Sequence, residues 1–282
     1  MKRLGLFAYA TTATIFAVIA GAIGSSSHKV VLTQLQRVPV GQENLYIRNL
    51  DPKDFSDQEI LRDIPAWERA VNVDFASYWH TTQYKIIFIG REQAPQGAIT
   101  AEFVKKGPVK GALAYHWTER NNAPSITVYS GTGAYYGYDN SVSFTHELEE
   151  LAADPVTANL NLGYPADYFY VQKPSGIKIE FNTAIGWFGE VSDPVEADWY
   201  TRPGADGKPV KISDFVTPSW FNDGVGGTFD FMGLCQQPFW IRPGGYAQFL
   251  DANGWEVVLN FRKGHPSDRG FYFQDNDRRA LK

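Results

Sequence analysis

Cysteine is almost absent from this sequence: Cys235 is the only one among 282 residues. A single cysteine excludes an internal disulfide framework and any zinc site built from cysteines. Such a residue most often serves as a small, buried apolar side chain. The fold must therefore rest on an apolar core. A content of 44% apolar and 15% aromatic residues is enough for one large domain or two closely packed subdomains.

Positive charge is not in excess either. The formal net charge is −5 and the isoelectric point is about 5.6, and the sequence has no basic run or aromatic-spaced basic stripe. Internal repeats and low-complexity tracts are also missing. A nucleic-acid-binding protein needs a basic surface to meet the phosphate backbone, so we expect no nucleic acid among the partners.

One long apolar run stands near the N-terminus. Residues 4–24 (LGLFAYATTATIFAVIAGAIG) carry no charge and follow Lys2 and Arg3. Two interpretations stay open. The basic start, the apolar run and the small residues Ala22 and Gly24 are typical of a cleaved signal peptide. A length of about 31 Å, at about 1.5 Å per residue, is instead enough for a retained membrane anchor.

Both interpretations place residues 25–282 outside the cytoplasm, because the basic residues before the apolar run favour the inner side of the membrane. We therefore expect an exported protein, membrane-anchored or secreted, whose contact with the membrane is the apolar run. Ala13, Ala17 and Gly21 recur every four residues and would let two such helices pack closely. A homo-oligomer is one assembly that this pattern favours.

The rest of the chain predicts an α+β fold with a mixed sheet. Ser56 and Glu59 form a capping-box pattern before apolar residues at helical spacing, which predicts a helix from Ser56. A second helix is predicted over residues 141–155. Between them, β-branched and aromatic residues predict strands over residues 82–90, 98–106, 111–117 and 124–131.

These patterns divide the chain into segments. The C-terminal part contains many turns and aromatic strand patterns such as SGIKIEF, GGYAQFL and WEVVLNF, so we expect it to be mostly β or irregular and to close a cleft. The expected segments are a signal peptide or anchor at 1–24, a stalk or linker at 25–50, an N-terminal subdomain at 51–155, a C-terminal subdomain at 156–262 and a polar tail at 263–282.

The helix at 141–155 reads SVSFTHELEELAADP and carries a candidate metal site. At about 100° per residue, Glu150 lies about 40° from His146 and Glu147 about 100°, while the apolar side chains lie on the other side. His146 and Glu150 stand one turn apart, about 6 Å along the helix axis, and can bracket one ion. Glu147 flanks them as a candidate general base.

A third ligand must come from elsewhere in the chain. The best source is the segment GEVSDPVEADWY, residues 189–200, which holds Glu190, Asp193 and Glu196. If this segment is helical up to its proline, Glu190 and Asp193 share a face by their i, i+3 spacing. One of them can then ligate while the other orients a ligand by a hydrogen bond. The residues alone leave all three acids open.

Several motifs follow one another in a specific order: IPAWERAVNVDFASYW, GALAYHW, THELEELAADP, EVSDPVEADWY, ISDFVTPSWF and RPGGYAQF. This series resembles a group of poorly characterised phage and bacterial proteins with a zincin-like core, whose histidine helix reads HExxExxxDP. The likeness covers roughly residues 55–260. It implies a zincin-type fold in which His146 and Glu150 are metal ligands, Glu190 completes the site and Glu147 is the general base.

Such a site would make the protein a zinc-dependent metallopeptidase that hydrolyses a peptide or protein substrate. Zinc with three protein ligands lowers the pKa of a bound water towards about 7 and polarises the scissile carbonyl. One histidine with two carboxylates is a harder ligand set than two histidines with one carboxylate, so manganese and calcium compete with zinc. If strand 111–117 borders the cleft, an extended peptide can add to its edge near His116.

A second class of function stays open. Glu150 occupies the position where well-established zincins have a second histidine. A retained anchor would also suit an envelope or virion component. The alternative is therefore a non-catalytic structural or binding protein that keeps a zincin scaffold and has virion partners in place of a substrate.

Overall fold

A computed structural model describes part of the chain: residues 41–107, 112–118, 123–155, 168–171, 177–180, 184–222, 226–251, 255–261, 271–273 and 279–280. All described residues belong to one compact unit of the chain. Within this described part, no helix has both the length and the apolar character needed to cross a bilayer. The predicted signal peptide or anchor at 1–24 lies outside the described residues.

The first helix, α1 (Asp57–Arg69), begins where the sequence predicts it. Ser56 is the N-cap: its Oγ accepts a hydrogen bond from the backbone N–H of Glu59, and the Glu59 carboxylate accepts one from the N–H of Ser56 at 2.8 Å. This reciprocal pair satisfies two backbone donors that the helix leaves free. Pro65 lies inside α1 without ending it. The chain continues as a π-helix, Ala70–Phe75, and as α2, Ala76–Trp79.

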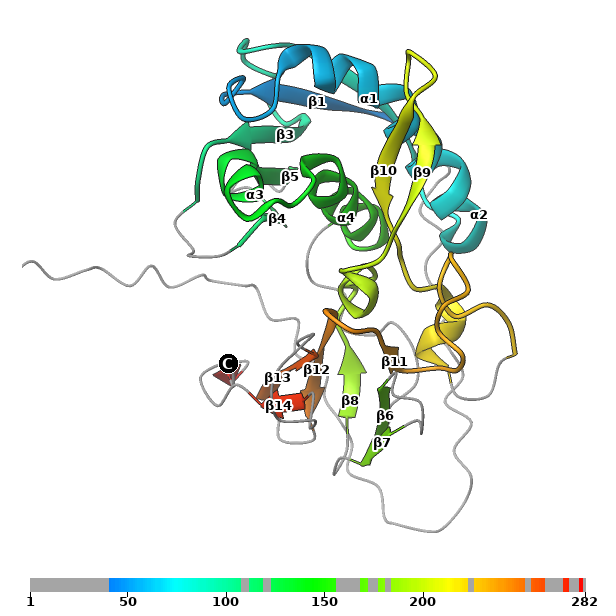
Figure 1. Cartoon of the computed structure of the whole chain (residues 1–282). Helices are drawn as coiled ribbons and strands as arrows, with labels where there is room; N and C mark the ends of the chain where they lie inside the picture. Colours follow the sequence, from blue (N-terminus) through cyan, green and yellow to red (C-terminus); the bar gives the residue numbers. More distant parts are fainter. Residues whose placement is uncertain are drawn as a thin grey trace, which may run out of the picture. The chain divides into compact units, whose positions relative to one another are not determined.

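A five-stranded mixed sheet accompanies these helices, which confirms the α+β class. Its strand order is β2-β1-β3-β5-β4, and Figure 1 labels β1, β3, β5 and β4. Four of the strands run parallel, whereas β4 pairs antiparallel with β5 and occupies the edge, with His116 opposite Ile126. The strands are β1 (Gln42–Asn49), β2 (Gln83–Phe88), β3 (Ile99–Val104), β4 (Ala114–Thr118) and β5 (Pro124–Tyr129).

Strand β1 corrects the expected stalk at 25–50. It pairs with β2 on one side and with β3 on the other. Leu45, Ile47 and Asn49 alternate along it as fully buried residues. The stalk interpretation is wrong for residues 42–49, because a strand flanked on both edges and buried in this way belongs to the core.

The second predicted helix, α4, packs against β4, β5 and the later strand β10. Its apolar side joins an aromatic core, since the ring of Phe144 lies 4.5 Å from that of Trp67 and 5.6 Å from that of Phe103. The indole N–H of Trp67 also donates to Ser141 Oγ at 2.7 Å. These contacts fix the rotation of α4 and hence the direction of its acidic side. The two helices in this region are α3 (Ser130–Tyr136) and α4 (Asn140–Ala153).

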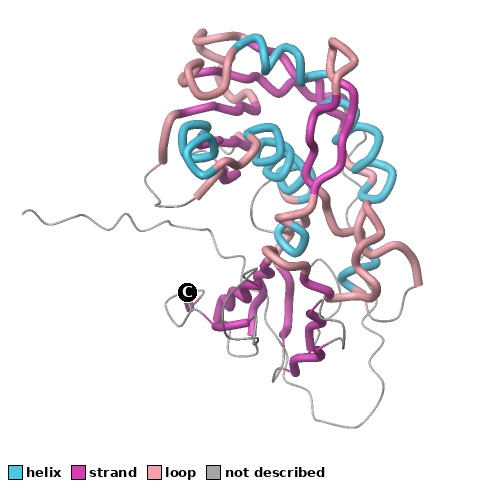
Figure 2. Tube along the Cα trace, viewed as in Figure 1, coloured by secondary structure: helices cyan, strands magenta, loops and turns pink. Residues whose placement is uncertain are grey.

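The described segments after α4 are strands, loops and short 3₁₀-helices (Figure 2). β9 and β10 form an antiparallel hairpin, β6, β7 and β11 form a three-stranded sheet, and β12 and β13 pair at the centre of a further sheet. The strands are β6 (Tyr168–Val171), β7 (Ile177–Glu180), β8 (Ala184–Trp187), β9 (Trp199–Pro203), β10 (Pro209–Ser213), β11 (Trp240–Ile241), β12 (Tyr246–Asp251), β13 (Trp255–Phe261), β14 (Phe271–Phe273) and β15 (Arg279–Ala280). The 3₁₀-helices are Asp193–Val195 and Pro218–Phe221. Two of these strands, β14 and β15, lie within the expected polar tail at 263–282.

Candidate metal centre

Helix α4 carries three side chains with metal or acid–base chemistry on its acidic side. The helix begins after its N-cap Asp139 and ends before its C-cap Asp154. His146 and Glu147 are each 7% exposed and Glu150 is 2% exposed. Burial to this degree is unfavourable for charged groups unless partners of opposite charge compensate it. The surroundings of these side chains therefore decide their chemistry.

The first group of candidate ligands, here called the His146 cluster, joins α4 to the 3₁₀-helix at 193–195. His146 Nε2 lies 3.3 Å from Glu150 Oε1 and 3.2 Å from Asp193 Oδ1. All three ligand atoms lie within 4.8 Å of one another, and all three residues are buried. The spacing of His146 and Glu150 is the i, i+4 relation that the sequence predicts, and Asp193 is one of the three downstream acids.

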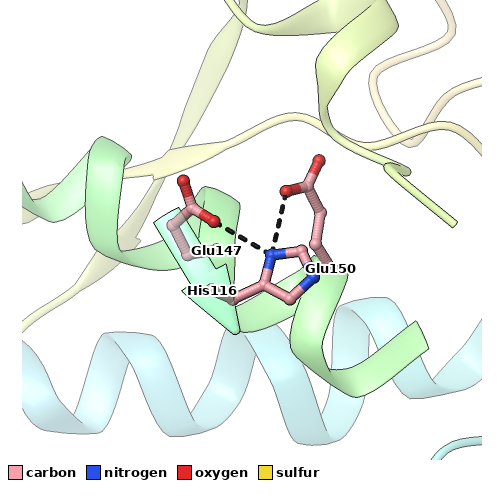
Figure 3. Close-up of side chains that lie close together, drawn as sticks. All are labelled: His116, Glu147 and Glu150. Carbon is pink, nitrogen blue, oxygen red and sulfur yellow. Dashed lines mark hydrogen bonds and ion pairs between the residues drawn. The ribbon is translucent and has the colours of Figure 1, made fainter. Parts of the chain in front are cut away.

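The second group, here called the His116 cluster, joins α4 to the edge strand β4. His116 Nδ1 lies 3.0 Å from Glu147 Oε2 and 3.6 Å from Glu150 Oε2 (Figure 3). These three ligand atoms also lie within 4.8 Å of one another. Glu150 belongs to both clusters, and each of its two carboxylate oxygens faces a different histidine.

Glu190 lies next to the two clusters without belonging to either of them among the described residues. The negative charge of Glu190 contributes to raising the pKa of Glu150, so the two carboxyl groups are neighbours. Residues 188–192 are not helical, and the 3₁₀-helix starts only at Asp193. The condition for a common helix face of Glu190 and Asp193 is therefore not met. Glu190 lies in an irregular loop, and Asp193 is the first residue of the 3₁₀-helix.

Hydrogen bonds from neighbouring groups hold the acids of the His146 cluster in place. Gln248, on β12, donates from Nε2 to Asp193 Oδ2 at 3.1 Å, so Asp193 Oδ1 is left to face His146. The backbone N–H of Ser192 donates to Glu150 Oε1 at 3.2 Å. Partners of this kind orient metal-binding carboxylates in many proteins.

Both histidines are held in an environment that favours the imidazolium. Burial disfavours the charge of His116, but the hydrogen bond to Glu147 and the nearby Glu190 outweigh it and raise the pKa to about 9. For His146, burial is outweighed by Asp193 and Glu147, and the pKa is again raised to about 9. Each histidine therefore acts as the counter-charge of the carboxylates that a metal ion would otherwise neutralise.

The pKa values of three carboxyl groups in the centre are raised as well. Burial, together with the charges of Asp193, Glu190 and Glu147, raises the pKa of Glu150 well above its ordinary range. Burial also raises the pKa of Glu190 to about 7 and that of Glu196 to about 7. The charges of His116 and His146 lower the pKa values of Glu190 and Glu196 only in part, and a metal ion would lower them further.

A pocket of about 630 Å³ lies beside the two clusters, and His146 and Glu147 form part of its wall. Residues 112–114, which lead into β4, line it on one side, and Trp199 and Tyr246 line it elsewhere. Glu147 is therefore both a neighbour of the candidate ligands and a residue that a molecule in the pocket can reach.

Comparison with protein-family models, curated proteins and solved structures finds no match for this chain. The assignment of a metal centre therefore depends on the residues themselves. Among the described residues, two groups of histidine and acidic side chains could hold a metal ion. The sequence offers Asp193 as one of three candidate third ligands and His116 as a strand residue near the cleft. Gln248 could not be identified as part of the site from the sequence, because its contact depends on β12 reaching Asp193.

Proposed function

We propose that this protein is an exported, zincin-type metallopeptidase whose metal ion is held by the His146 cluster. The observation that carries the proposal is the spacing of the ligand atoms: 3.2 and 3.3 Å from His146 Nε2 to Asp193 and Glu150. Tetrahedral ligands about 2.0–2.1 Å from a zinc ion are about 3.3 Å apart, which matches both of these distances, and the oxygens of Glu150 and Asp193 lie within 4.8 Å of each other. The resemblance placed Glu190 as the third ligand. The ligand spacing favours Asp193 for that role, with Glu190 as a neighbour of Glu150.

The chain's own residues fit the reaction. A divalent cation in such a site polarises a carbonyl group and lowers the pKa of water. Glu147 lines the pocket next to His146 and can accept a proton there as general base. His116 donates to Glu147 from β4 when its Nδ1 carries a proton, which holds the carboxylate in one orientation.

A peptide substrate is supported by the free edge of β4. This strand pairs with β5 on one side, and it is the last strand of its sheet among the described residues. The residues that lead into it line the pocket. An extended peptide can add to such an edge through main-chain hydrogen bonds, which would bring its backbone past His116 and Glu147.

Zinc is the proposed ion, with manganese as the main competitor. The His146 cluster offers one imidazole and two carboxylates, and oxygen-rich ligand sets suit harder ions. Metal content of the purified full chain would test the site directly. Hydrolysis of a broad peptide library, before and after removal of the metal by a chelator, would test the activity.

Three outcomes of this experiment differ in meaning. Metal binding with chelator-sensitive hydrolysis supports the peptidase. Metal binding without hydrolysis of any library member favours the non-catalytic scaffold, for example an envelope or virion component. A protein that binds neither zinc nor manganese would refute the metal centre.

The export part of the proposal rests on residues 4–24 and the basic residues that precede them. Protease protection in intact cells or sealed vesicles tests it: residues 41 onward should be on the extracytoplasmic side. Mass spectrometry of the mature N-terminus would separate a cleaved signal peptide from a retained anchor. Protection of these residues on the cytoplasmic side would overturn the export proposal and leave the metal centre unaffected.

A further inference from the structure

We propose that the His116 cluster is a second cation site, so that the centre binds a pair of divalent ions bridged by Glu150. This inference rests on the metal centre of the proposed function and adds a second ion to it. The ligands of the second ion are His116, Glu147 and Glu150, and its chemical class is a divalent ion that accepts both imidazole and carboxylate, such as Mn²⁺ or Zn²⁺.

The position of Glu150 is the main geometric support. Its Oε1 faces His146 Nε2 at 3.3 Å, and its Oε2 faces His116 Nδ1 at 3.6 Å. A carboxylate that binds a single ion needs only one histidine beside it, whereas Glu150 has one beside each oxygen. When a carboxylate bridges two metal ions, each of its oxygens binds one ion, and each ion can also bind one imidazole. The two histidines beside Glu150 have this arrangement, and ions bridged in this way are usually about 3.5–4 Å apart.

The ligand spacing of the second site also fits an ion. His116 Nδ1 lies 3.0 Å from Glu147 Oε2, in addition to the 3.6 Å distance to Glu150 Oε2. Neighbouring ligands about 2.1 Å from an octahedral ion are about 3.0 Å apart, and tetrahedral ligands are about 3.3 Å apart. The side chains of His116 and Glu147 are 6% and 9% exposed, so the site is shielded yet borders the pocket wall.

The count of charges points the same way. The centre gathers the carboxylates of Glu147, Glu150, Glu190, Asp193 and Glu196 around His116 and His146. Among the described residues, no lysine or arginine forms an ion pair with any of these carboxylates.

Burying acidic side chains is costly unless a positive charge lies near them, so a group of acids without a lysine or arginine partner suits a second cation. Glu147 contributes Oε2 to the second ion, and its other oxygen remains available to accept a proton.

The test is the number of Mn²⁺ ions bound by the purified full chain, measured by elemental analysis after equilibrium dialysis. We expect two ions per wild-type chain and one ion per His116→Gln chain, because that change removes a ligand of the second site alone. The electron paramagnetic resonance spectrum of the wild type should show two manganese ions coupled through a carboxylate bridge. This measurement needs no variant, so it decides the question even if His116→Gln fails to fold.

His80→Asn is the matched control. His80 is an exposed histidine in the left-handed backbone region (φ 53°), a conformation that asparagine also tolerates. The control should keep two ions. One ion per wild-type chain with an uncoupled spectrum would overturn the second site and leave the proposed function standing. Two ions that both persist in His116→Gln would place the second ion elsewhere, and a chain that binds neither Mn²⁺ nor Zn²⁺ would overturn both proposals.

Discussion

Glu150 lies between two histidines from different parts of the chain, with Oε1 3.3 Å from His146 Nε2 on its own helix and Oε2 3.6 Å from His116 Nδ1 on the edge strand. It also accepts a hydrogen bond from the backbone N–H of Ser192 at 3.2 Å. This one carboxylate therefore connects α4, β4 and the loop before the 3₁₀-helix. Changes at Glu150 should affect metal binding more than changes at any other acid of the centre.

Glu150→Gln should abolish stabilisation by the metal without unfolding the protein. The amide keeps the shape of the side chain but removes the charge that both candidate ions share. For wild type, zinc at about 100 times its Kd should stabilise the fold by about 2.7 kcal/mol. The variant should show almost no increase in Tm on adding zinc. Glu92→Gln, at an exposed position, is the control and should keep the full increase. An equal zinc-dependent increase in both variants would refute the assignment of Glu150.

The metal-free protein should lose stability as the pH rises. The folded-state pKa values of Glu190 and Glu196 are raised from 4.5 to about 7, and those of His116 and His146 from 6.5 to about 9. The folded state thus binds more protons than the unfolded state across these intervals. This contribution to stability is complete below pH 4.5 and is lost between about pH 4.5 and 9.

A bound metal ion should reverse part of this dependence, because it replaces the protons and its binding releases them. The difference in Tm between zinc-loaded and chelator-treated protein should therefore be larger at pH 8.5 than at pH 5.5. Thermal unfolding at the two pH values measures it. The same difference at both values would mean that these protons and the metal ion do not compete for one site.

A change at Gln248 tests whether the hydrogen bond that orients Asp193 contributes to metal binding. Its Nε2 donates to Asp193 Oδ2 at 3.1 Å and leaves Oδ1 facing His146. Gln248→Met keeps the size of the side chain and removes the donor, so metal affinity should fall by about 10- to 100-fold. Calorimetric titration with zinc measures the affinity. Gln58→Met, at an exposed position of α1, should leave it unchanged. Unaltered affinity in Gln248→Met would show that this hydrogen bond does not support metal binding.

The helix could be predicted from the sequence, because its signals are local. Helical periodicity alone brings His146 and Glu150 to one side of α4, and the capping box alone starts α1 at the predicted place. Both features depend only on residues within about one turn of each other.

Residues outside the helices were harder to place. The choice between Glu190 and Asp193 depends on the path of an irregular loop, and periodicity carries no information about such a path. Strand β1 was missed because its pattern, QENLYIRN, has only two apolar side chains that are buried, Leu45 and Ile47. The contact of His116 with Glu147 requires β4 to be the edge strand next to α4, which is set by strand order and not by local pattern.

Glu147 separates an enzyme from a binding scaffold. It lines the pocket beside His146, and its Oε2 lies 3.0 Å from His116 Nδ1. In Glu147→Gln the amide can still occupy this position and ligate through its oxygen, but it cannot accept a proton from water. Peptide hydrolysis should therefore fall by about 10² to 10⁴. The ion held by His146, Glu150 and Asp193 should remain bound.

Two measurements on the same sample complete this test. Elemental analysis should find the ion of the His146 cluster in Glu147→Gln. Turnover of the best peptide from the library should be reduced at saturating substrate, because the change removes a proton acceptor and leaves the edge of β4 free to bind the peptide. Glu102→Gln, which removes a charge from the sheet at its ion pair with Arg48, is the control and should keep wild-type turnover. Full turnover in Glu147→Gln would exclude Glu147 as the base. Loss of the His146-cluster ion along with activity would instead identify Glu147 as a ligand of that ion.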